Sequence, residues 1–189
     1  QEARGEPGLH PHLRFHFARS AFRRTGQRSA QLAKAATVRP TDDRARLVVR
    51  GLTVGGAGDT SLSNQLAIGS GALVKTGAGT LTLSGANTYT GTTTISGGTV
   101  IVTNNAGLGT TAGGTSVASG ATLDLHNVTV GAEAITLAGG TLKDVTSSLA
   151  GNITLTADST LVATNVGDTL TLSGVISGSY GITKSGAGT

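Results

Sequence analysis

The chain has 189 residues with 14 Lys/Arg, 10 Asp/Glu and no Cys, enough for one ordinary domain. The lack of cysteine excludes thiol catalysis, thiolate metal sites and disulfides. No apolar run approaches the roughly 20 residues of a membrane-spanning helix, so we expect no such span. Arginines interrupt the apolar stretches near the start, so we also expect no secretory signal within the chain.

The composition changes sharply near residue 50. Residues 1–50 hold eleven of the 14 cations and four of the ten acids, a net charge of +7, with all the Pro and Phe residues. The rest has three Lys and six acidic residues, a net charge of −3, and 27 of the 30 glycines. We therefore expect a basic, Arg-rich arm at 1–50 and a Gly/Thr/Ser-rich segment at 51–189. The positive net charge of the whole chain comes from the arm and says nothing about the binding partners of residues 51–189.

The arm allows three interpretations: an ill-defined or mistranslated N-terminus, a disordered basic tail, or a transit-like helix. It has no acid between Glu6 and Asp42, so it could bind phosphates or anionic lipid, but we expect no specific nucleic-acid partner. We expect it not to pack on the remaining segment. Three histidines in the arm have no carboxylate beside them and are expected to be solvated: His10, His12 and His16.

Two short patterns after the arm are suggestive of chemistry. Residues 55–59 are one residue short of the calcium-binding Gly-Gly-x-Gly-x-Asp repeat and have no second copy, so a plain turn is favoured. Residues 58–62 resemble an esterase nucleophile block, but Thr60 separates the Asp from the Ser. His126, the only later histidine, has no pattern to orient it as a base. We expect no catalytic residue, metal or cofactor.

From about residue 53 onward, short runs alternate apolar and polar residues. These runs are 81–83, 99–102, 122–125, 135–137, 153–155, 160–162 and 170–172. Alternation with a period of two predicts strands with one buried face. The side chains expected to face inward include Leu123, Leu125, Ile135 and Leu137, whereas Thr122, Asp124 and Thr136 are expected to face water.

The spacing of the runs indicates a solenoid. Leading apolar residues at 95, 117, 137, 155 and 172 step by 22, 20, 18 and 17 residues, about one coil of a parallel β-helix. Residues 58–80 also align with 167–189 at ten of 23 positions. We predict an all-β parallel solenoid of five to six coils. An antiparallel β-sandwich has similar strand spacing but does not explain the self-overlap.

One stretch carries a long and specific motif. From Lys75 the sequence follows Lys-x-Gly-x-Gly-Thr-Leu-x-Leu-x-Gly, then Asn-Thr-Tyr-Thr-Gly, then Gly-Gly-Thr. This resembles the autotransporter-associated β-strand repeat, also called the passenger-associated transport repeat, most strongly over about 71–102. We take one copy as 58–102 and the start of the next as 167–189. The motif positions, for which we expect a structural role, are Lys75, Gly77, Gly79, Thr80, Leu81, Leu83, Gly85, Tyr89, Gly91, Gly97, Gly98, Lys184, Gly186 and Gly188.

The Lys-Thr-Gly-Ala-Gly stretch at 75–79 also has the composition of a phosphate-binding loop. However, a P-loop places its Lys after the glycines and opens a helix, whereas here Lys75 precedes them and a strand follows. We therefore expect a turn that keeps Lys75 at its solvated edge.

The resemblance implies a right-handed parallel β-helix from the passenger of a type V secreted protein. It implies an outer-membrane β-barrel translocator as partner and a bacterial cell-surface, outer-membrane or extracellular location. The expected role is a non-enzymatic stalk that assists passenger folding, translocation and display. An adhesive module for host or neighbouring-cell surfaces is the alternative. A hydrolase is disfavoured because Asp124, Asp144 and Asp158 are scattered.

Overall fold

A computed structural model describes residues 51–189, and the predicted basic arm at 1–50 lies outside the described residues. All the regular secondary structure from residue 51 onward is β-strand, arranged in three parallel sheets. Sheet A contains β1 (Gly51–Val54), β3 (Ala72–Lys75), β5 (Thr93–Ile95), β7 (Thr115–Ala118), β10 (Ile135–Ala138), β13 (Ile153–Ala157) and β16 (Ile176–Ser177). Sheet B contains β2 (Thr60–Leu62), β4 (Thr80–Leu83), β6 (Thr99–Val102), β8 (Thr122–His126), β11 (Thr141–Val145), β14 (Ser159–Ala163) and β17 (Ile182–Ser185). Sheet C is shorter and contains β9 (Thr129–Val130), β12 (Ser147–Leu149) and β15 (Leu170–Leu172).

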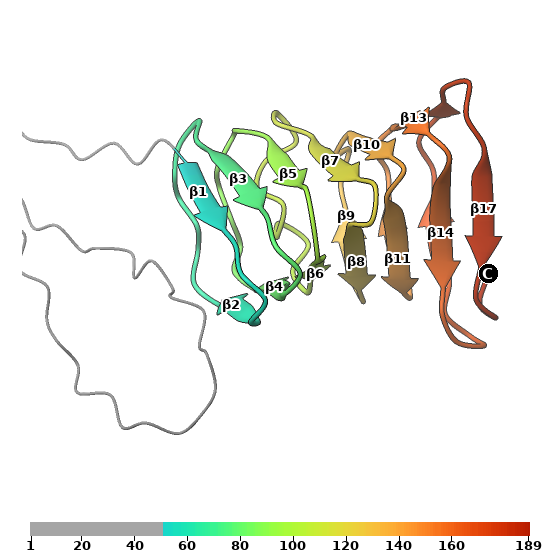
Figure 1. The fold of residues 1–189 in the computed structure, drawn as a ribbon, viewed down its shortest axis with the longest axis horizontal. Helices are drawn as coiled ribbons and strands as arrows, with labels where there is room; N and C mark the ends of the chain where they lie inside the picture. Colours follow the sequence, from blue (N-terminus) through green and yellow to red (C-terminus); the bar gives the residue numbers. More distant parts are fainter. Residues whose placement is uncertain (1–50) are drawn as a thin grey trace, which may run out of the picture.

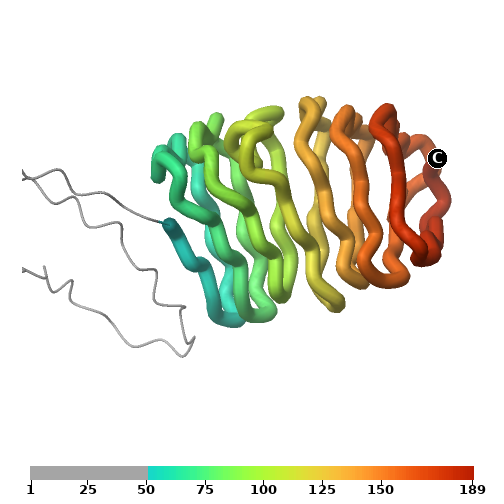
Figure 2. The backbone as a smooth tube through the Cα atoms, turned by 90° about the horizontal axis from the view of Figure 1, so that it is seen from above, coloured from blue at the N-terminus to red at the C-terminus, as the bar shows by residue number. Residues whose placement is uncertain are grey.

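The chain winds through the sheets in turn, so that each strand pairs with its equivalent in the preceding and following coils. Thr93 pairs with Thr115, and Thr115 pairs with Ile135, always in parallel. Figures 1 and 2 show the coils stacked along the long axis from residue 51 to the C-terminus. The predicted all-β parallel solenoid is confirmed.

The predicted number of coils is wrong: the solenoid has about seven turns, not five to six. The leading residues start at Ile95, so the coils that begin with β1 and β3 are missing from the count. The prediction also makes Leu172 the leading residue of the last coil. Leu172 instead ends β15 in sheet C, where it pairs with Leu149. The strand that continues sheet A is β16, in which Ile176 pairs with Ile153, 23 residues earlier. Alternation marks a strand without showing which sheet it joins, because all three sheets bury one face.

The core is a set of inward columns of aliphatic side chains. Leu123, Leu125, Ile135 and Leu137 all lie inside, each at most 1% exposed, as the alternation predicts. Column partners come from successive coils: Leu123 pairs with Val100 on one side and Leu142 on the other. No coil buries its inner face alone, so burial depends on stacking.

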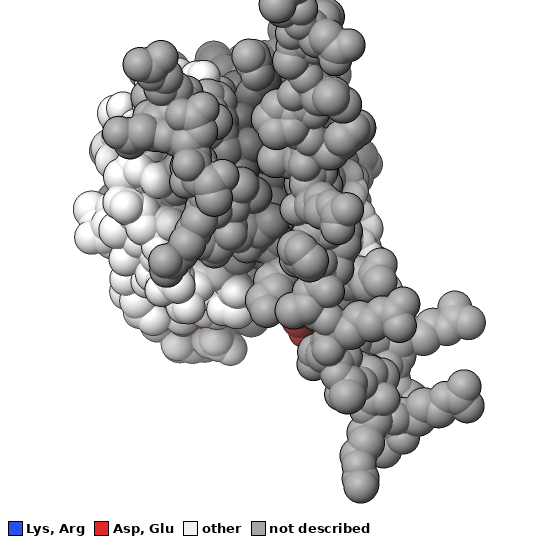
Figure 3. Space-filling view, turned by 90° about the vertical axis from the view of Figure 1, so that its left-hand side faces the viewer, with Lys and Arg blue, Asp and Glu red and all other residues white. Residues whose placement is uncertain are grey.

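The outer face carries matching columns of short hydroxyl side chains. One column on sheet B is formed entirely by threonines in register: Thr80, Thr99, Thr122, Thr141, Thr160 and Thr183. Charges are few, and the visible described surface at the N-terminal end is almost entirely uncharged (Figure 3). Within residues 51–189 no helix is long and apolar enough to cross a membrane.

Candidate functional site

The lysine of the repeat motif lies inside the solenoid and not at its edge. Lys75 is the last residue of β3, and its side chain is only 1% exposed. Its Nζ donates to the carbonyl oxygens of Thr76 at 3.0 Å, Gly77 at 2.8 Å and Gly97 at 3.2 Å. The expectation of a solvated Lys75 is therefore wrong. Burial lowers the pKa of Lys75, and the charge of Asp59 opposes that effect.

The glycines around Lys75 are required by close backbone approach. Gly98 has a φ of +68°, and a Cβ there would lie 2.6 Å from the Gly77 carbonyl oxygen and 2.8 Å from Lys75 Nζ. A Cβ on Gly79 would collide with the carbonyl of Gly58 in the preceding coil. Only glycine allows both this φ and this contact without displacing backbone.

Tyr89 and Asn87, from the middle of the motif, hold buried polar positions. Tyr89 is fully buried, and its hydroxyl lies 2.7 Å from Thr93 Oγ1. Asn87 accepts from the Leu66 amide at 2.8 Å and donates to the Gly107 carbonyl at 2.6 Å. Asn87 thus links the coil before it to the coil after it. It was not singled out as a site residue, although it lies within the Asn-Thr-Tyr-Thr-Gly element.

The second motif copy has a similar lysine contact in a different place. Lys184 lies on β17 of sheet B, whereas Lys75 lies on β3 of sheet A. Lys184 Nζ donates to the Gly186 carbonyl at 3.0 Å and also to the Gly188 carbonyl. The local lysine-to-turn contact therefore recurs, although the two aligned segments belong to different sheets.

A charged cluster lies on the outer face of sheet B. Asp124 Oδ2 accepts from Lys143 Nζ at 2.8 Å, and Asp124 Oδ1 lies 3.0 Å from His126 Nε2. These two neighbours cover the carboxylate, so Asp124 is only 3% exposed. The prediction that Asp124 faces water is therefore wrong. Asp124 also lies beside His126, a contact that the residue pattern did not predict. Ser61, on β2, is separated from β8 by β4 and β6, so the structure does not bring this serine to His126.

The other suggestive motif, at 55–59, ends in a structural hydrogen bond. Asp59 Oδ1 accepts from the Thr80 amide of the next coil at 2.8 Å. Among residues 51–189 no group of three or more His, Cys, Asp or Glu side chains is placed to hold a metal ion.

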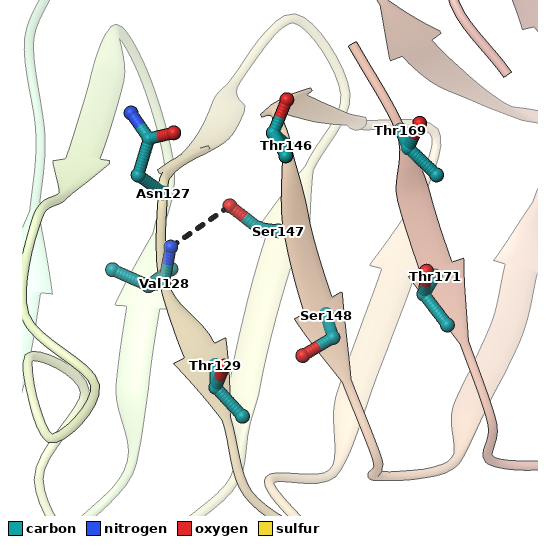
Figure 4. Close-up of a pocket in the computed structure, with 8 residues that line it drawn as sticks. All are labelled: Asn127, Val128, Thr129, Thr146, Ser147, Ser148, Thr169 and Thr171. Atoms are coloured by element: carbon teal, nitrogen blue, oxygen red, sulfur yellow. Dashed lines mark hydrogen bonds between the residues drawn. The ribbon is translucent and has the colours of Figure 1, made fainter.

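A shallow polar groove of about 340 Å³ runs along the outer face of sheet C (Figure 4). Ser148 pairs with Thr129 on one side and with Thr171 on the other, so three hydroxyls stand in one row. A second row consists of Asn127, Thr146 and Thr169. Beneath the groove, Ser147 Oγ accepts from the Val128 amide at 3.1 Å. None of the lining residues is charged.

Both non-glycine residues with positive φ among residues 51–189 line this groove: Asn127 at +50° and Thr146 at +51°. They occupy the corner where the chain turns from sheet B into sheet C. Asparagine adopts this conformation readily, whereas a β-branched threonine does so at a cost. This corner conformation places Asn127 and Thr146 in one of the two polar rows of the groove.

Comparison with protein families gives one match. Residues 73–102 match the passenger-associated-transport-repeat family. No curated protein and no solved structure matches the chain. The match covers β3 to β6 and includes Lys75, Tyr89 and the glycines whose contacts are described above. Residues 73–102 are therefore a passenger-associated transport repeat, built into a parallel β-solenoid.

Proposed function

We propose that residues 51–189 are a non-enzymatic stalk segment of an autotransporter passenger, which displays distal parts of the passenger and assists its folding during export. In this role the segment lies at a bacterial surface or in the medium. The proposal names an outer-membrane β-barrel translocator as the partner of the full protein. The family match over 73–102 supports this class of protein.

The observation that carries the stalk proposal is that every strand pairing joins neighbouring coils. β3, for example, pairs only with β1 and β5, and β4 only with β2 and β6. Such a chain can fold one coil at a time, since each new coil needs only the one before it as a template. This order suits a polypeptide that emerges progressively from a pore.

The test is surface display in a bacterium. The full chain is placed between an N-terminal epitope and an outer-membrane β-barrel translocator, and epitope exposure is measured by added protease and antibody. We expect wild type to display the epitope and Leu123→Asp, which disrupts a core column, to display it several-fold less. Thr122→Asp is the matched control. Equal display by all three would contradict a folding-assisted stalk.

The non-enzymatic part of the proposal has its own test. The acidic side chains of residues 51–189 have individual structural environments: Asp59 and Asp158 accept backbone amides, and Asp124 pairs with Lys143. Polysaccharide hydrolysis generally needs two carboxyl groups facing one substrate. Incubation with a panel of polysaccharides and chromogenic esters should give no turnover, and turnover that Asp124→Asn abolishes would overturn this part.

The groove on sheet C favours adhesion as a second candidate function. Its two uncharged rows offer hydroxyl and amide groups that suit a neutral glycan chain lying across the coils. Ser148→Arg would fill the groove, and Thr136→Arg on the outer face of sheet A is the control. A screen against immobilised neutral glycans should show retention that only Ser148→Arg removes. Absence of retention by the wild-type chain would exclude this candidate.

A further inference from the structure

Two carboxyl groups of the solenoid lack the environment that the other acids have. Glu133 is 3% exposed and Asp144 is fully buried, and both lie inside the coils. The remaining acids of residues 51–189 accept backbone amides or pair with a cation: Asp59, Asp124, Asp158 and Asp168. A buried charge without a cation is strongly destabilising, so these two positions need an explanation.

Glu133 ends a chain of buried polar groups that crosses three coils. It lies just before β10, and its Oε1 accepts from Thr115 Oγ1 of the preceding coil at 2.8 Å. Thr115 pairs in register with Thr93, whose hydroxyl lies 2.7 Å from the Tyr89 hydroxyl. The titratable group at the other end of this chain of groups is Tyr89, whose pKa the charge of Glu133 raises. Tyr89 is not a cation and cannot compensate a charge on Glu133. The whole chain of groups is neutral when Glu133 is protonated.

Asp144 is more isolated than Glu133. It faces inward from β11, between Leu125 of β8 and Ala163 of β14. Neither carboxyl oxygen has a hydrogen bond of ordinary length and angle among the described residues, and its polar neighbours are the Ser147 hydroxyl and the amides of Ser147 and Thr146. The charged group that acts on it is Asp168 of the next coil, which is acidic as well. Lys143, its neighbour on the same strand, points outward to Asp124.

The local environment favours the protonated form of both carboxyls. Burial raises the pKa of Glu133, and the Thr115 hydroxyl only partly offsets this. Burial also raises the pKa of Asp144. The nearby Ser147 hydroxyl and the amides of Ser147 and Thr146 oppose this rise, while Asp168 adds to it.

From this geometry we propose that Glu133 and Asp144 form a proton-dependent clasp in the middle coils. With both carboxyls protonated, the coils from β7 to β14 close around them. Loss of the protons places uncompensated charge inside the solenoid and opens these coils, while the coil of β3 and β4, at the start of the repeat motif, stays closed. Protonation therefore stabilises the folded stalk, and a rise in pH destabilises it.

The sign of the effect follows from proton linkage. The ordinary pKa values are about 3.9 for Asp and 4.3 for Glu, so in the unfolded chain both groups ionise first. Above about pH 4 the folded state therefore holds more protons than the unfolded state, and stability falls as the pH rises towards the folded pKa values. Each group lowers the folding equilibrium constant by up to about tenfold per pH unit in that window.

The test measures urea unfolding of the full chain at several pH values from about 4, where the unfolded carboxyls begin to ionise, up to 8. We expect the wild-type midpoint to fall as the pH rises. Glu133→Gln and Asp144→Asn should each reduce the slope, and the double variant should remove most of it. Asp158→Asn is the matched control, because Asp158 is exposed and its amide keeps an acceptor oxygen for Gly181. Groups elsewhere that titrate in this range are common to all variants.

A second measurement needs no variant to fold. Hydrogen exchange of the wild-type chain, corrected for the intrinsic pH dependence of exchange, should show protection falling as the pH rises above about 4 in β7, β8, β10 and β11. Protection of β3 and β4 should change little. A urea midpoint that is flat or rises with pH, a slope that the amide variants keep, or uniform protection across the coils would each overturn the clasp.

Discussion

The side-chain nitrogen of Lys75 lies 3.2 Å from the carbonyl oxygen of Gly97, in the coil that follows. The same nitrogen also donates to two carbonyls of its own turn. The Lys75 side chain is buried, whereas Thr76 and Gly97 are only partly buried and Gly77 is exposed. The motif lysine therefore joins two coils by satisfying backbone carbonyls, which explains why glycines surround it.

Replacing Lys75 with methionine should destabilise the solenoid markedly. Lys75→Met keeps most of the side-chain volume but removes three hydrogen bonds from a charged donor to backbone carbonyls, at a cost of about 1–3 kcal/mol. Lys184→Met removes a similar contact from an exposed strand, where water can replace it, and should cost under about 1 kcal/mol. Urea midpoints of the two variants test this, and equal losses would contradict a special role for Lys75.

A new charge should destabilise the solenoid far more at an inward position than at an outward position of the same strand. Leu123→Asp places a carboxylate in a core column without a partner, which we expect to cost on the order of 3–5 kcal/mol. Thr122→Asp changes the adjacent outward column and should cost under about 1 kcal/mol. Urea unfolding of both variants checks the assignment. If Thr122→Asp were the more damaging change, the register of β8 would be wrong.

The alternation in the sequence predicted the buried columns correctly because side chains of a strand must alternate between its two faces. Leu123 and Leu137 could be assigned from this rule alone. The rule says nothing about which sheet receives a strand, and this is why Leu172 was placed in the wrong one. The number of coils was underestimated because the leading residues began at Ile95, which left out the coils of β1 and β3.

Burial of charged groups could not be predicted because it depends on neighbours from other coils. Asp124 stands on the outward face as expected, yet Lys143, from the following coil, covers it. Lys75 is buried because the next coil supplies the Gly97 carbonyl. The groove on sheet C is also invisible in the sequence, since register alone aligns Ser148 with its partners in the coils on either side.

Asp124 and Lys143 should show a favourable coupling energy. Lys143→Ala leaves the Asp124 carboxylate buried with only His126 beside it, so this variant should lose more stability than Asp124→Asn. A double-mutant cycle should give a coupling of about 1–3 kcal/mol, because the pair is partly shielded from solvent. Coupling near zero would mean that the ion pair behaves as an exposed surface contact.

Tyr89 should ionise much later than an ordinary tyrosine. Burial raises the pKa of Tyr89 to about 12, against the opposing effect of the Thr93 hydroxyl, and Glu133 adds to the rise. In the unfolded chain the phenol ionises near pH 10, so the solenoid loses stability as the pH rises from about 10 through 12. Phenolate absorbance should therefore show a late step that Tyr89→Phe removes and Tyr180→Phe keeps. A single early step in the folded wild type would contradict the buried position of Tyr89.

Asn87 should be the most sensitive amide of the repeat. Its side chain serves the Leu66 amide with one atom and the Gly107 carbonyl with the other, across the coils on both sides. Asn87→Ala would leave the buried Gly107 carbonyl and the partly buried Leu66 amide without partners, which we expect to cost about 2–4 kcal/mol. The matched control is Asn152→Ala: Asn152 also bonds to a following coil, accepting from the Val175 amide, but it is exposed. Water can take over that contact, so the control should cost under about 1 kcal/mol. Urea midpoints give the comparison, and hydrogen exchange locates it, because protection of the Leu66 amide should fall only in Asn87→Ala. Similar midpoints for the two variants, with Leu66 still protected, would show that Asn87 does not hold the coils together.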